Sequence, residues 1–324
     1  MNSLLKIQVA IGVCLWGLSV APGLAQGYPA RPIRIITGNP GATADILTRQ
    51  IGRRLTDRWG QQIVVDNRGG AGGTIAAEIT ANAAPDGYTL LMGQLNSHAL
   101  AVNLHKKLSY DALHDFSPIS FIASAPQVLV VNRSFPADNW SQFAQFIRQH
   151  PGKFNYATSG YGTGSHLTSE LLKQIAKLDI AHINYKGGAA ATFAITSGEA
   201  SAGFVLLSTA MTALQSGKIK PLAISSMQRF PTLPNVPTFH ESGLAKFEAS
   251  SWFGMFGPAS TTRTLVGLLN REIVDILRTA AVQQDLLKLG AVATPSTPEE
   301  FGAFVKSEIL KWREVIYLAG IQKQ

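Results

Sequence analysis

The sequence has little cysteine and little charge. Cys14 is its only cysteine, and charged residues occupy 15% of its 324 positions. A single cysteine excludes an intrachain disulfide, a cysteine-based zinc site and a Cys-x-x-Cys redox pair. The hydrophobic fraction of 46% provides a large core and excludes a disordered or collagen-like chain. At about 100–200 residues per domain, the length predicts two domains.

Clusters of positive charge are also missing, although the net charge is +8. Adjacent basic residues occur only at Arg53-Arg54 and Lys106-Lys107. A nucleic-acid-binding protein usually gathers its basic residues into a stripe with stacking aromatics, so we expect no nucleic-acid partner. A scattered cationic surface at most attracts small anions toward a cleft.

The N-terminal segment has the layout of a secretory signal peptide. Residues 1–6 carry one positive charge, residues 7–20 are almost wholly apolar, and Ala25 is a small residue suited to cleavage. The alternative, a membrane anchor, needs about 20 apolar residues. Cleavage after Ala25 leaves residues 26–324, in which no other stretch is apolar enough to span a bilayer. We therefore expect a soluble, exported protein.

Short β-branched or aromatic runs alternate with helical patterns along the rest of the chain. The predicted strands are Ile33–Thr37, Ile63–Asn67, Tyr88–Gly93, Gln127–Asn132, Phe154–Ser159, His182–Lys186, Ala202–Leu207 and Leu222–Ser226. Apolar residues every four positions at Leu47, Ile51 and Leu55 predict a helix after the first strand. Residues 297–300 (TPEE) predict a helix start with a capping box, whereas the proline-rich residues 230–237 predict an extended connector.

This alternation predicts an α/β fold, with doubly wound domains whose helices cover both faces of parallel sheets. Ligands bind in such folds at loops beyond the carboxyl ends of the strands. Two such junctions, residues 37–45 and 159–166, are rich in glycine and small hydroxyl residues. Their glycines let the backbone approach a ligand, and free N–H groups at the helix starts attract carboxylate or phosphate. Either junction alone could be an ordinary turn, but two in different halves favour a cleft between domains.

A third glycine-rich stretch, residues 68–74, does not fit a nucleotide-binding motif. No Gly-Lys-Ser/Thr follows it, and Ile75 stands where a dinucleotide fingerprint needs its third glycine or alanine. We interpret it as a structural loop and expect no cofactor.

Catalytic constellations are also absent from the sequence. It contains no HExxH and no GxSxG motif, and its histidines lack metal-ligand spacing. Ser165 and His166 are adjacent, so their side chains point apart at a helix start and make a poor nucleophile–base pair; His166 is more typical of a structural histidine. Asp45 could act as a general base, as a helix N-terminal carboxylate or as a partner for a ligand amine. We expect a binding protein without catalytic residues or a metal.

Nine segments, in order, carry a resemblance to a known family. They are residues 28–36 (YPARPIRII), 64–78 (VVDNRGGAGGTIAAE), 84–93 (APDGYTLLMG), 109–120 (SYDALHDFSPIS), 155–167 (NYATSGYGTGSHL), 185–188 (YKGG), 216–225 (SGKIKPLAIS), 233–243 (LPNVPTFHESG) and 297–301 (TPEEF). The chain thereby resembles, from Tyr28 to about Gln322, the periplasmic solute receptors of tripartite tricarboxylate transporters, also called the Bug family.

The resemblance implies a type II periplasmic-binding-protein fold, in which two domains close like a Venus flytrap. Domain 1 would comprise residues 26–125 and 252–324, and domain 2 residues 126–251, with crossings near Ser124–Val128 and Ser250–Phe256. The family clamps a small carboxylate between a loop of each domain. Matched by position, the implied ligand-binding residues are Gly41, Ala42, Thr43, Asp45, Ser97, Ser159, Gly160, Gly162, Thr163, Ser165 and Tyr185, with Lys186 beside the last.

The chain departs from the family pattern at several of these loops. Gly38 and Asn39 replace residues of a Pro-Phe-Pro-Pro-Gly-Gly loop, Asn184 and Ser208 each replace a proline, and Val205 stands where an aspartate is usual. These changes affect the expected shape and polarity of the pocket more than the fold, so they leave the identity of the ligand undetermined.

The function implied is that of a periplasmic, monomeric solute-binding protein that delivers a small carboxylate to membrane transporter subunits. An alternative partner is a membrane sensor protein that reads the closed form. An enzyme that uses Asp45 or His166 is disfavoured, because the sequence offers no activated nucleophile.

Overall fold

The computed structural model describes residues 27–323. The predicted signal peptide lies outside these residues. Among the helices from residue 27 to residue 323, none combines the length and apolar character needed to cross a membrane.

The first lobe is built on a six-stranded sheet. Its strands are β1 (Ile33–Thr37), β2 (Ile63–Asn67), β3 (Thr89–Gln94), β4 (Phe116–Ala125), β10 (Ser251–Pro258) and β11 (Val292–Ala293), in the order β11-β4-β10-β3-β1-β2. β1 runs parallel to β2 and β3, whereas β10 runs antiparallel to both of its neighbours, β3 and β4. The sequence predicts a parallel sheet, but this sheet is mixed. The reason is that β10 returns from the second lobe and enters between β3 and β4.

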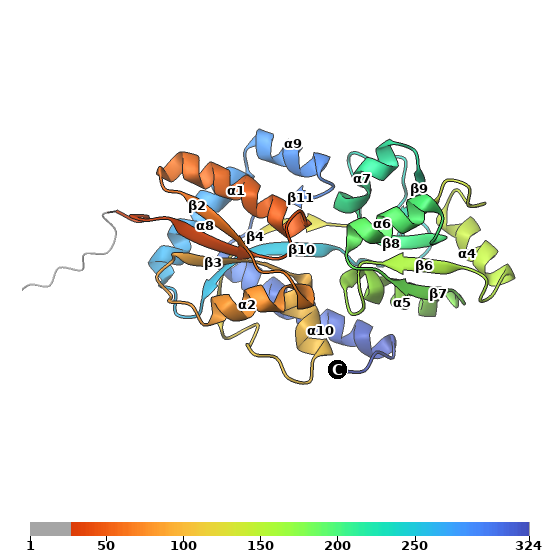
Figure 1. Ribbon diagram of the computed structural model, residues 1–324, viewed down its shortest axis with the longest axis horizontal. Coiled ribbons are helices and arrows are strands. Elements are labelled where there is room, and N and C mark those ends of the chain that lie inside the picture. The colour runs from red at the N-terminus through yellow and green to blue at the C-terminus, as the bar shows by residue number, and fades with distance from the viewer. Residues whose placement is uncertain (1–26, 324) are drawn as a thin grey trace, which may run out of the picture.

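Helices cover both faces of this sheet (Figure 1). They are α1 (Thr43–Trp59), α2 (Thr74–Ala81), α3 (Ala101–Leu104), α8 (Arg263–Leu277), α9 (Ala280–Lys288) and α10 (Pro298–Leu318), with a 3₁₀ turn η1 (Ala71–Gly73) and a π-helical turn η2 (Asn96–Leu100). The predicted α1 stripe is buried, since Leu47, Ile51 and Leu55 pack with Leu269 and Ile273 of α8. Burial of such a stripe, at about 25 cal/mol per Å² of apolar surface, stabilises the helix far more than its intrinsic propensity.

The second lobe repeats the same plan with five strands. They are β5 (Gln127–Asn132), β6 (Asn155–Thr158), β7 (Ala181–Asn184), β8 (Ala202–Leu206) and β9 (Ile219–Ile224), in the order β7-β6-β8-β5-β9. Its helices are α4 (Trp140–Gln149), α5 (Gly164–Ala176), α6 (Gly188–Ser197) and α7 (Leu207–Gln215). This sheet is also mixed, because β5 arrives from the first lobe and enters antiparallel between β8 and β9.

Two neighbouring segments carry the chain between the lobes. β4 ends at Ala125 and β5 begins at Gln127, while Ser251 at the start of β10 pairs with Ala125 on the return. The Gln127 N–H donates to the Ser225 hydroxyl over 2.9 Å, and that hydroxyl donates to the Ala249 carbonyl over 3.1 Å. The Ser225 hydroxyl thus links the outgoing segment to the returning one.

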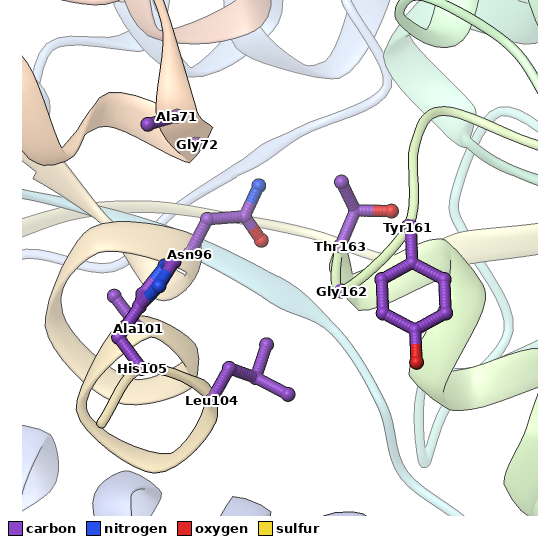
Figure 2. A pocket seen from close by; sticks show the side chains of 9 residues that line it. All are labelled: Ala71, Gly72, Asn96, Ala101, Leu104, His105, Tyr161, Gly162 and Thr163. Atoms are coloured by element: carbon purple, nitrogen blue, oxygen red, sulfur yellow. The ribbon is translucent and has the colours of Figure 1, made fainter. Parts of the chain in front are cut away.

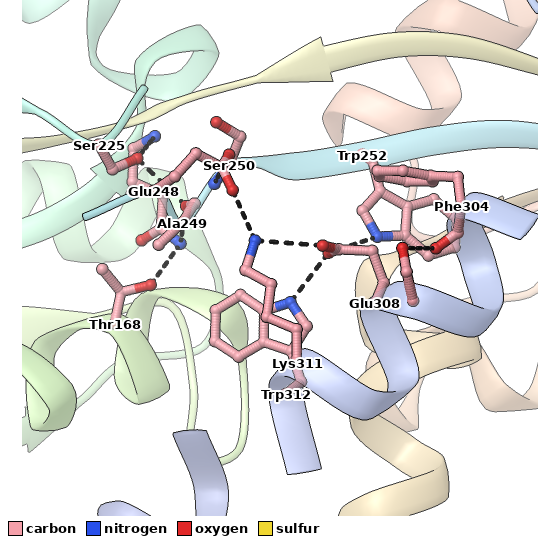
Figure 3. Close-up of polar contacts among 12 residues, drawn as sticks. Thr168, Ser225, Glu248, Ala249, Ser250, Trp252, Phe304, Glu308, Lys311 and Trp312 are labelled. Atoms are coloured by element: carbon pink, nitrogen blue, oxygen red, sulfur yellow. Dashed lines mark hydrogen bonds and ion pairs between the residues drawn. The ribbon is translucent and has the colours of Figure 1, made fainter. Parts of the chain in front are cut away.

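An ion cluster on α10 lies beside this crossing (Figure 3). The buried carboxylate of Glu308 accepts from the indole N–H groups of Trp252, over 3.1 Å, and Trp312, over 3.0 Å. Lys311 lies 3.1 Å from Glu308 and 2.5 Å from Glu248, which precedes the returning segment. The two carboxylates raise the pKa of Lys311 although burial opposes them. The cluster thus ties the C-terminal helix to the segment that joins the lobes.

The capping box at the start of α10 is confirmed. The Glu300 N–H donates to the Thr297 hydroxyl over 3.2 Å, and the Thr297 N–H donates to the Glu300 carboxylate over 2.9 Å. Residues 230–237 contain no helix, as predicted, but they are not simply extended. The Leu233 N–H donates to the Phe230 carbonyl over 2.9 Å, and the Val236 N–H donates to the Leu233 carbonyl over 3.0 Å, so the connector contains two turns.

Candidate functional site

A pocket of about 160 Å³ lies between the two lobes (Figure 2). The first lobe contributes residues of η1, η2 and α3, and the second lobe contributes the loop between β6 and α5. The lining residues are Ala71, Gly72, Asn96, Ala101, Leu104, His105, Tyr161, Gly162 and Thr163. The lobes touch at its base, where a Cβ added to Gly162 would lie 3.0 Å from Leu104 Cδ1. Gly162 has a φ of +72°, so this position favours glycine for its backbone as well as for its space.

Three hydroxyl groups organise the second-lobe loop. The Ser159 and Ser165 hydroxyl oxygens lie 2.8 Å apart, and both lie within 3.2 Å of the Thr163 hydroxyl. Thr163 donates to the Gly160 carbonyl over 2.6 Å, and the Ser159 N–H donates to Ser165 over 3.0 Å. These bonds hold the loop at the start of α5 in one shape and bring Thr163 to the pocket.

His166 holds the other side of this loop. Its Nδ1 accepts from the Gly162 N–H over 3.2 Å. Its ring stacks on that of His182, with centroids 4.5 Å apart, and lies tilted against that of Tyr161, with centroids 4.6 Å apart. Burial, with His182 adding to it, lowers the pKa of His166 to about 4. The imidazole is therefore neutral at pH 7, and its lone pair is engaged by the loop it supports.

Asp45 shapes the first-lobe loop in a comparable way. Its carboxylate, which is 4% exposed, accepts from the Gly41 N–H and the Asn67 amide, both over 2.9 Å, and lies 3.0 Å from the Arg49 guanidinium. These partners lower the pKa of Asp45 against the effect of burial. The carboxylate is thus ionised and fully engaged at the helix start, which matches the helix N-terminal role among the three considered from the sequence.

The two lobes also meet at the start of α1. The Thr43 hydroxyl lies 2.8 Å from the hydroxyl of Ser208 in the first turn of α7. Within residues 27–323, no partner takes up the N–H groups of Thr43 and Ala44, as is usual in a first helical turn. The helix starts of α1 and α7 therefore face each other across the interlobe gap.

Ser97 and Tyr185 are engaged inside their own lobes. Ser97 is buried, lies 2.9 Å from Nδ1 of His98 and donates to the Gln94 carbonyl over 3.1 Å. The Tyr185 hydroxyl donates to Glu199 over 2.8 Å. Burial of the hydroxyl, with Glu199 adding to it, raises the pKa of Tyr185.

The structure places two of the eleven predicted ligand-binding residues, Gly162 and Thr163, in the lining of this pocket. Gly160 and the hydroxyls of Ser159 and Ser165 support the same loop. Gly41, Ala42, Thr43 and Asp45 lie together at the start of α1, whereas Ser97 and Tyr185 lie within their lobes.

Several lining residues were not predicted from the sequence. Ala71 and Gly72 belong to the stretch interpreted as a structural loop, and the structure places them in the pocket wall. Asn96 follows the end of β3, so the rule that ligands bind beyond strand ends could have identified it. Leu104 ends the short helix α3 and His105 follows it, and no sequence pattern marks either residue.

The Val205 departure lies away from the pocket. Its side chain is fully buried in the second-lobe core with Val128 and Ile195. Ser208, in contrast, supplies the hydroxyl that meets Thr43. Within residues 27–323, no group of three or more histidine, cysteine, aspartate or glutamate side chains is arranged to hold a metal ion.

Two α/β lobes, joined by paired crossing segments and separated by a pocket, define a two-lobed solute-binding protein. The model of the tripartite tricarboxylate transporter family receptor matches residues 47–321. The chain is 33% identical to Protein BugT of Bordetella pertussis, over 97% of this chain and 98% of that protein. The chain therefore belongs to the tripartite tricarboxylate transporter receptor family, and it is a receptor, not an enzyme.

Solved structures show the same fold. R. palustris Rpa4515 with adipate is 32% identical, with a TM-score of 0.86 over 92% of this chain and 100% of that chain. MatC (Rpa3494) from Rhodopseudomonas palustris with bound malate is 32% identical, with a TM-score of 0.80 over 89% of this chain and 99% of that chain. The family and the two-lobed α/β fold predicted from the sequence are confirmed.

Proposed function

We propose that this chain binds a small carboxylate between its lobes in the periplasm and presents the closed form to a membrane transporter. The observation that carries the proposal is a pocket lined from both lobes, by η1, η2 and α3 on one side and by the loop that leads into α5 on the other. The starts of α1 and α7 meet elsewhere between the lobes, at Thr43 and Ser208. The similar proteins with adipate and with malate support the carboxylate class.

Neutral donors suit a carboxylate here. Asn96 and the α5 start border the pocket, and no lysine or arginine is among its lining residues. The helix starts of α1 and α7 meet at Thr43 and Ser208, so two positive dipole ends lie close together. An anion between the lobes would relieve the repulsion between the two helix dipoles and would accept hydrogen bonds from the free N–H groups. Each such contact is worth about 0.3–1 kcal/mol when exposed and more when buried.

We propose different roles for the residues implied by the resemblance. Gly41, Ala42 and Thr43 form the first-lobe edge of the site, and Gly160, Gly162 and Thr163 form the second-lobe edge. Ser159 and Ser165 hold the second edge in shape, while Asp45, Ser97 and Tyr185 position the surrounding loops because their polar groups are already bonded.

The lobes close by bending at the two crossing segments. We propose a first domain of residues 26–125 and 252–324 and a second of residues 126–251, following the division of the strands into two sheets. The ligand would stabilise the closed arrangement, as in hinge closure of other binding proteins.

Calorimetry and thermal unfolding of residues 26–324 test the proposal against a panel of carboxylates. A bound ligand at 100 times its Kd should stabilise the protein by about 2.7 kcal/mol. Asn96→Ala should weaken binding, whereas Tyr317→Ala, at a side chain 82% exposed on α10, is the matched control. No stabilisation by any carboxylate, with Asn96→Ala behaving as wild type, would refute the proposal.

The partner and the export step need separate tests. The N-terminal residue of the secreted protein should be Gln26, as read by mass spectrometry, and size-exclusion chromatography should show a monomer. Transporter genes beside this one would support the transporter, whereas a sensor-kinase gene would favour a receptor that reports the ligand to a membrane sensor.

A further inference from the structure

The interlobe pocket has two chemically different ends. Asn96 and Thr163 lie at one end, while Leu104 and Tyr161 face each other from opposite lobes at the other (Figure 2). Ala101 lies one helical turn before Leu104; Ala101 is buried, and Leu104 belongs to the large apolar cluster that includes Leu95 and Leu100. The polar groups are therefore not spread evenly along the space open to a ligand.

Asn96 gives the polar end a definite orientation. Its Oδ1 accepts the Gly164 N–H over 3.3 Å at the start of α5. Because an N–H group donates to it, the amide atom that faces α5 must be the oxygen, and the amide nitrogen therefore faces away from α5. No acceptor among residues 27–323 takes up that nitrogen, and its two N–H groups are free to bind one carboxylate.

The other end lacks a counter-charge for a second carboxylate. Leu104 is 8% exposed and Ala101 is 3% exposed. Tyr161 supplies a hydroxyl at this end, and no lysine or arginine is among the residues that line the pocket. A carboxylate moved from water to such a wall would lose hydration without an ion partner to replace it.

We infer that the ligand carries a single carboxylate on an apolar or aromatic body. The inference rests on the proposed function, because it takes this pocket as the carboxylate site. The carboxylate binds the Asn96 amide near the α5 start, and the body packs between Leu104 and Tyr161. This class differs from the dicarboxylates adipate and malate that accompany the similar solved proteins.

Matched ligand pairs test the inference by calorimetry. Hexanoate and adipate have the same chain length and differ by one carboxylate, and phenylacetate adds an aromatic ring. Hexanoate or phenylacetate should bind at least about tenfold more tightly than adipate, since an unpaired buried charge costs more than a neutral hydrogen bond gains.

A charge placed at the apolar end should reduce this preference. Tyr161→Arg supplies the missing cation and should improve adipate binding about tenfold relative to hexanoate. Tyr317→Arg adds the same charge on α10 at an exposed side chain outside the pocket lining, and it should leave the ratio unchanged. His105→Ala tests whether that imidazole already holds a second carboxylate, in which case adipate binding would fall.

The outcomes separate the inference from the proposed function. Adipate binding as tightly as hexanoate in the wild type, or adipate binding lost in His105→Ala, would overturn the single-carboxylate class and leave carboxylate binding intact. If no carboxylate binds at all, the proposed function fails and the inference fails with it. Preference for the monocarboxylates, reduced about tenfold in Tyr161→Arg, would support both.

Discussion

At the residue scale, the titratable side chains around the site serve to hold loops. Asp45 accepts two hydrogen bonds and lies against Arg49, and His166 accepts a loop N–H through its neutral ring. From the sequence alone both residues are candidates for catalysis, because a carboxylate and a histidine at helix starts are common in active sites. Their bonding partners decide the matter, and partners depend on tertiary structure.

Asp45→Asn should destabilise the protein, because an amide nitrogen would face the N–H donors of Gly41 and Asn67. We expect a loss of about 1–3 kcal/mol in the free energy of unfolding at pH 7. The pKa of Asp45 is lowered in the folded state, so its contribution is present above the unfolded pKa and is lost as pH falls through the folded one. Urea unfolding at pH 7 and pH 3 should therefore show the difference from wild type shrinking in acid.

Asp57→Asn is the matched control, since Asp57 is exposed on the same helix. An equal loss in both variants would show that Asp45 contributes only helix charge and does not hold the loop.

His166 should make the protein sensitive to mild acid. Its folded pKa of about 4 lies below the unfolded value of 6.5, so the unfolded chain takes up the proton first. Stability is then complete above pH 6.5 and falls toward pH 4, by up to about 3 kcal/mol from this residue. Its titratable neighbours His182, Glu170 and Lys173 modulate the slope. Thermal unfolding from pH 7.5 to pH 4.5 measures it.

His166→Gln should flatten this pH dependence, because glutamine can accept the Gly162 N–H without titrating. His114→Gln is the control, since Asp111 raises the pKa of that exposed histidine and its contribution has the opposite sign. An unchanged slope in His166→Gln would contradict the assignment.

At the scale of elements, the predictions from sequence are accurate where one local pattern determines the structure. β1, β2 and β5 have the predicted bounds, and Thr297 and Glu300 form the predicted capping box. The apolar pattern does not identify β4 as a strand, because Pro118 and three serines interrupt its apolar residues. Proline is tolerated there because the residue it faces on β10 lies at a register shift.

The candidate site was only partly predictable for a similar reason. The glycine pattern identifies the loop with Gly162 and Thr163, since backbone freedom is visible in a sequence. Leu104 and Asn96 reach the same pocket through the π-helical turn after β3, which has no recognisable pattern here. The direction of the Tyr185 side chain, toward Glu199, depends on how α6 packs.

The ion cluster on α10 carries a prediction about how this helix is attached. Lys311→Met would leave Glu308, which is 5% exposed, with two indole donors and no cation. Since Lys311 also joins α10 to Glu248, we expect a loss of about 1–3 kcal/mol in the free energy of unfolding, measured with urea. Lys306→Met, on an exposed position of the same helix, should change it by less than about 0.5 kcal/mol. Equal effects would contradict a specific role for the cluster.

At the scale of the whole molecule, two kinds of contact join the lobes. One apolar cluster runs from Trp252 and Phe256 in the first lobe to Leu167 and Phe239 in the second, on the side of the crossing segments. Smaller contacts join the lobes elsewhere. Hydrogen bonds link Gly164 to Asn96 and Thr43 to Ser208. Leu206 of the second lobe packs against the first-lobe core, and Leu287 of the first lobe packs against the second-lobe core. Reversible closure requires that the apolar cluster at the hinge stays intact while the smaller contacts between the lobes break and form again.

The Thr43–Ser208 contact should therefore contribute to ligand affinity. Thr43→Val and Ser208→Ala each remove one hydroxyl of the 2.8 Å pair. A neutral hydrogen bond is worth about 0.5–1.5 kcal/mol, so each variant should raise the Kd of a bound carboxylate about 2–10-fold. The double variant should bind no more weakly than the weaker single one, because both substitutions break the same bond. Ser216→Ala, at the other end of α7, should bind as wild type.

Small-angle scattering then distinguishes closure from direct contact with the ligand. If the hydroxyl pair stabilises the closed form, the radius of gyration without ligand should rise in the double variant and still fall on saturation with ligand. A ligand that contacts either hydroxyl directly would instead give additive losses in Kd, since each substitution would remove its own bond, and an unchanged radius without ligand. Additive losses would therefore show that Thr43 and Ser208 contact the ligand directly and do not act by stabilising the closed form.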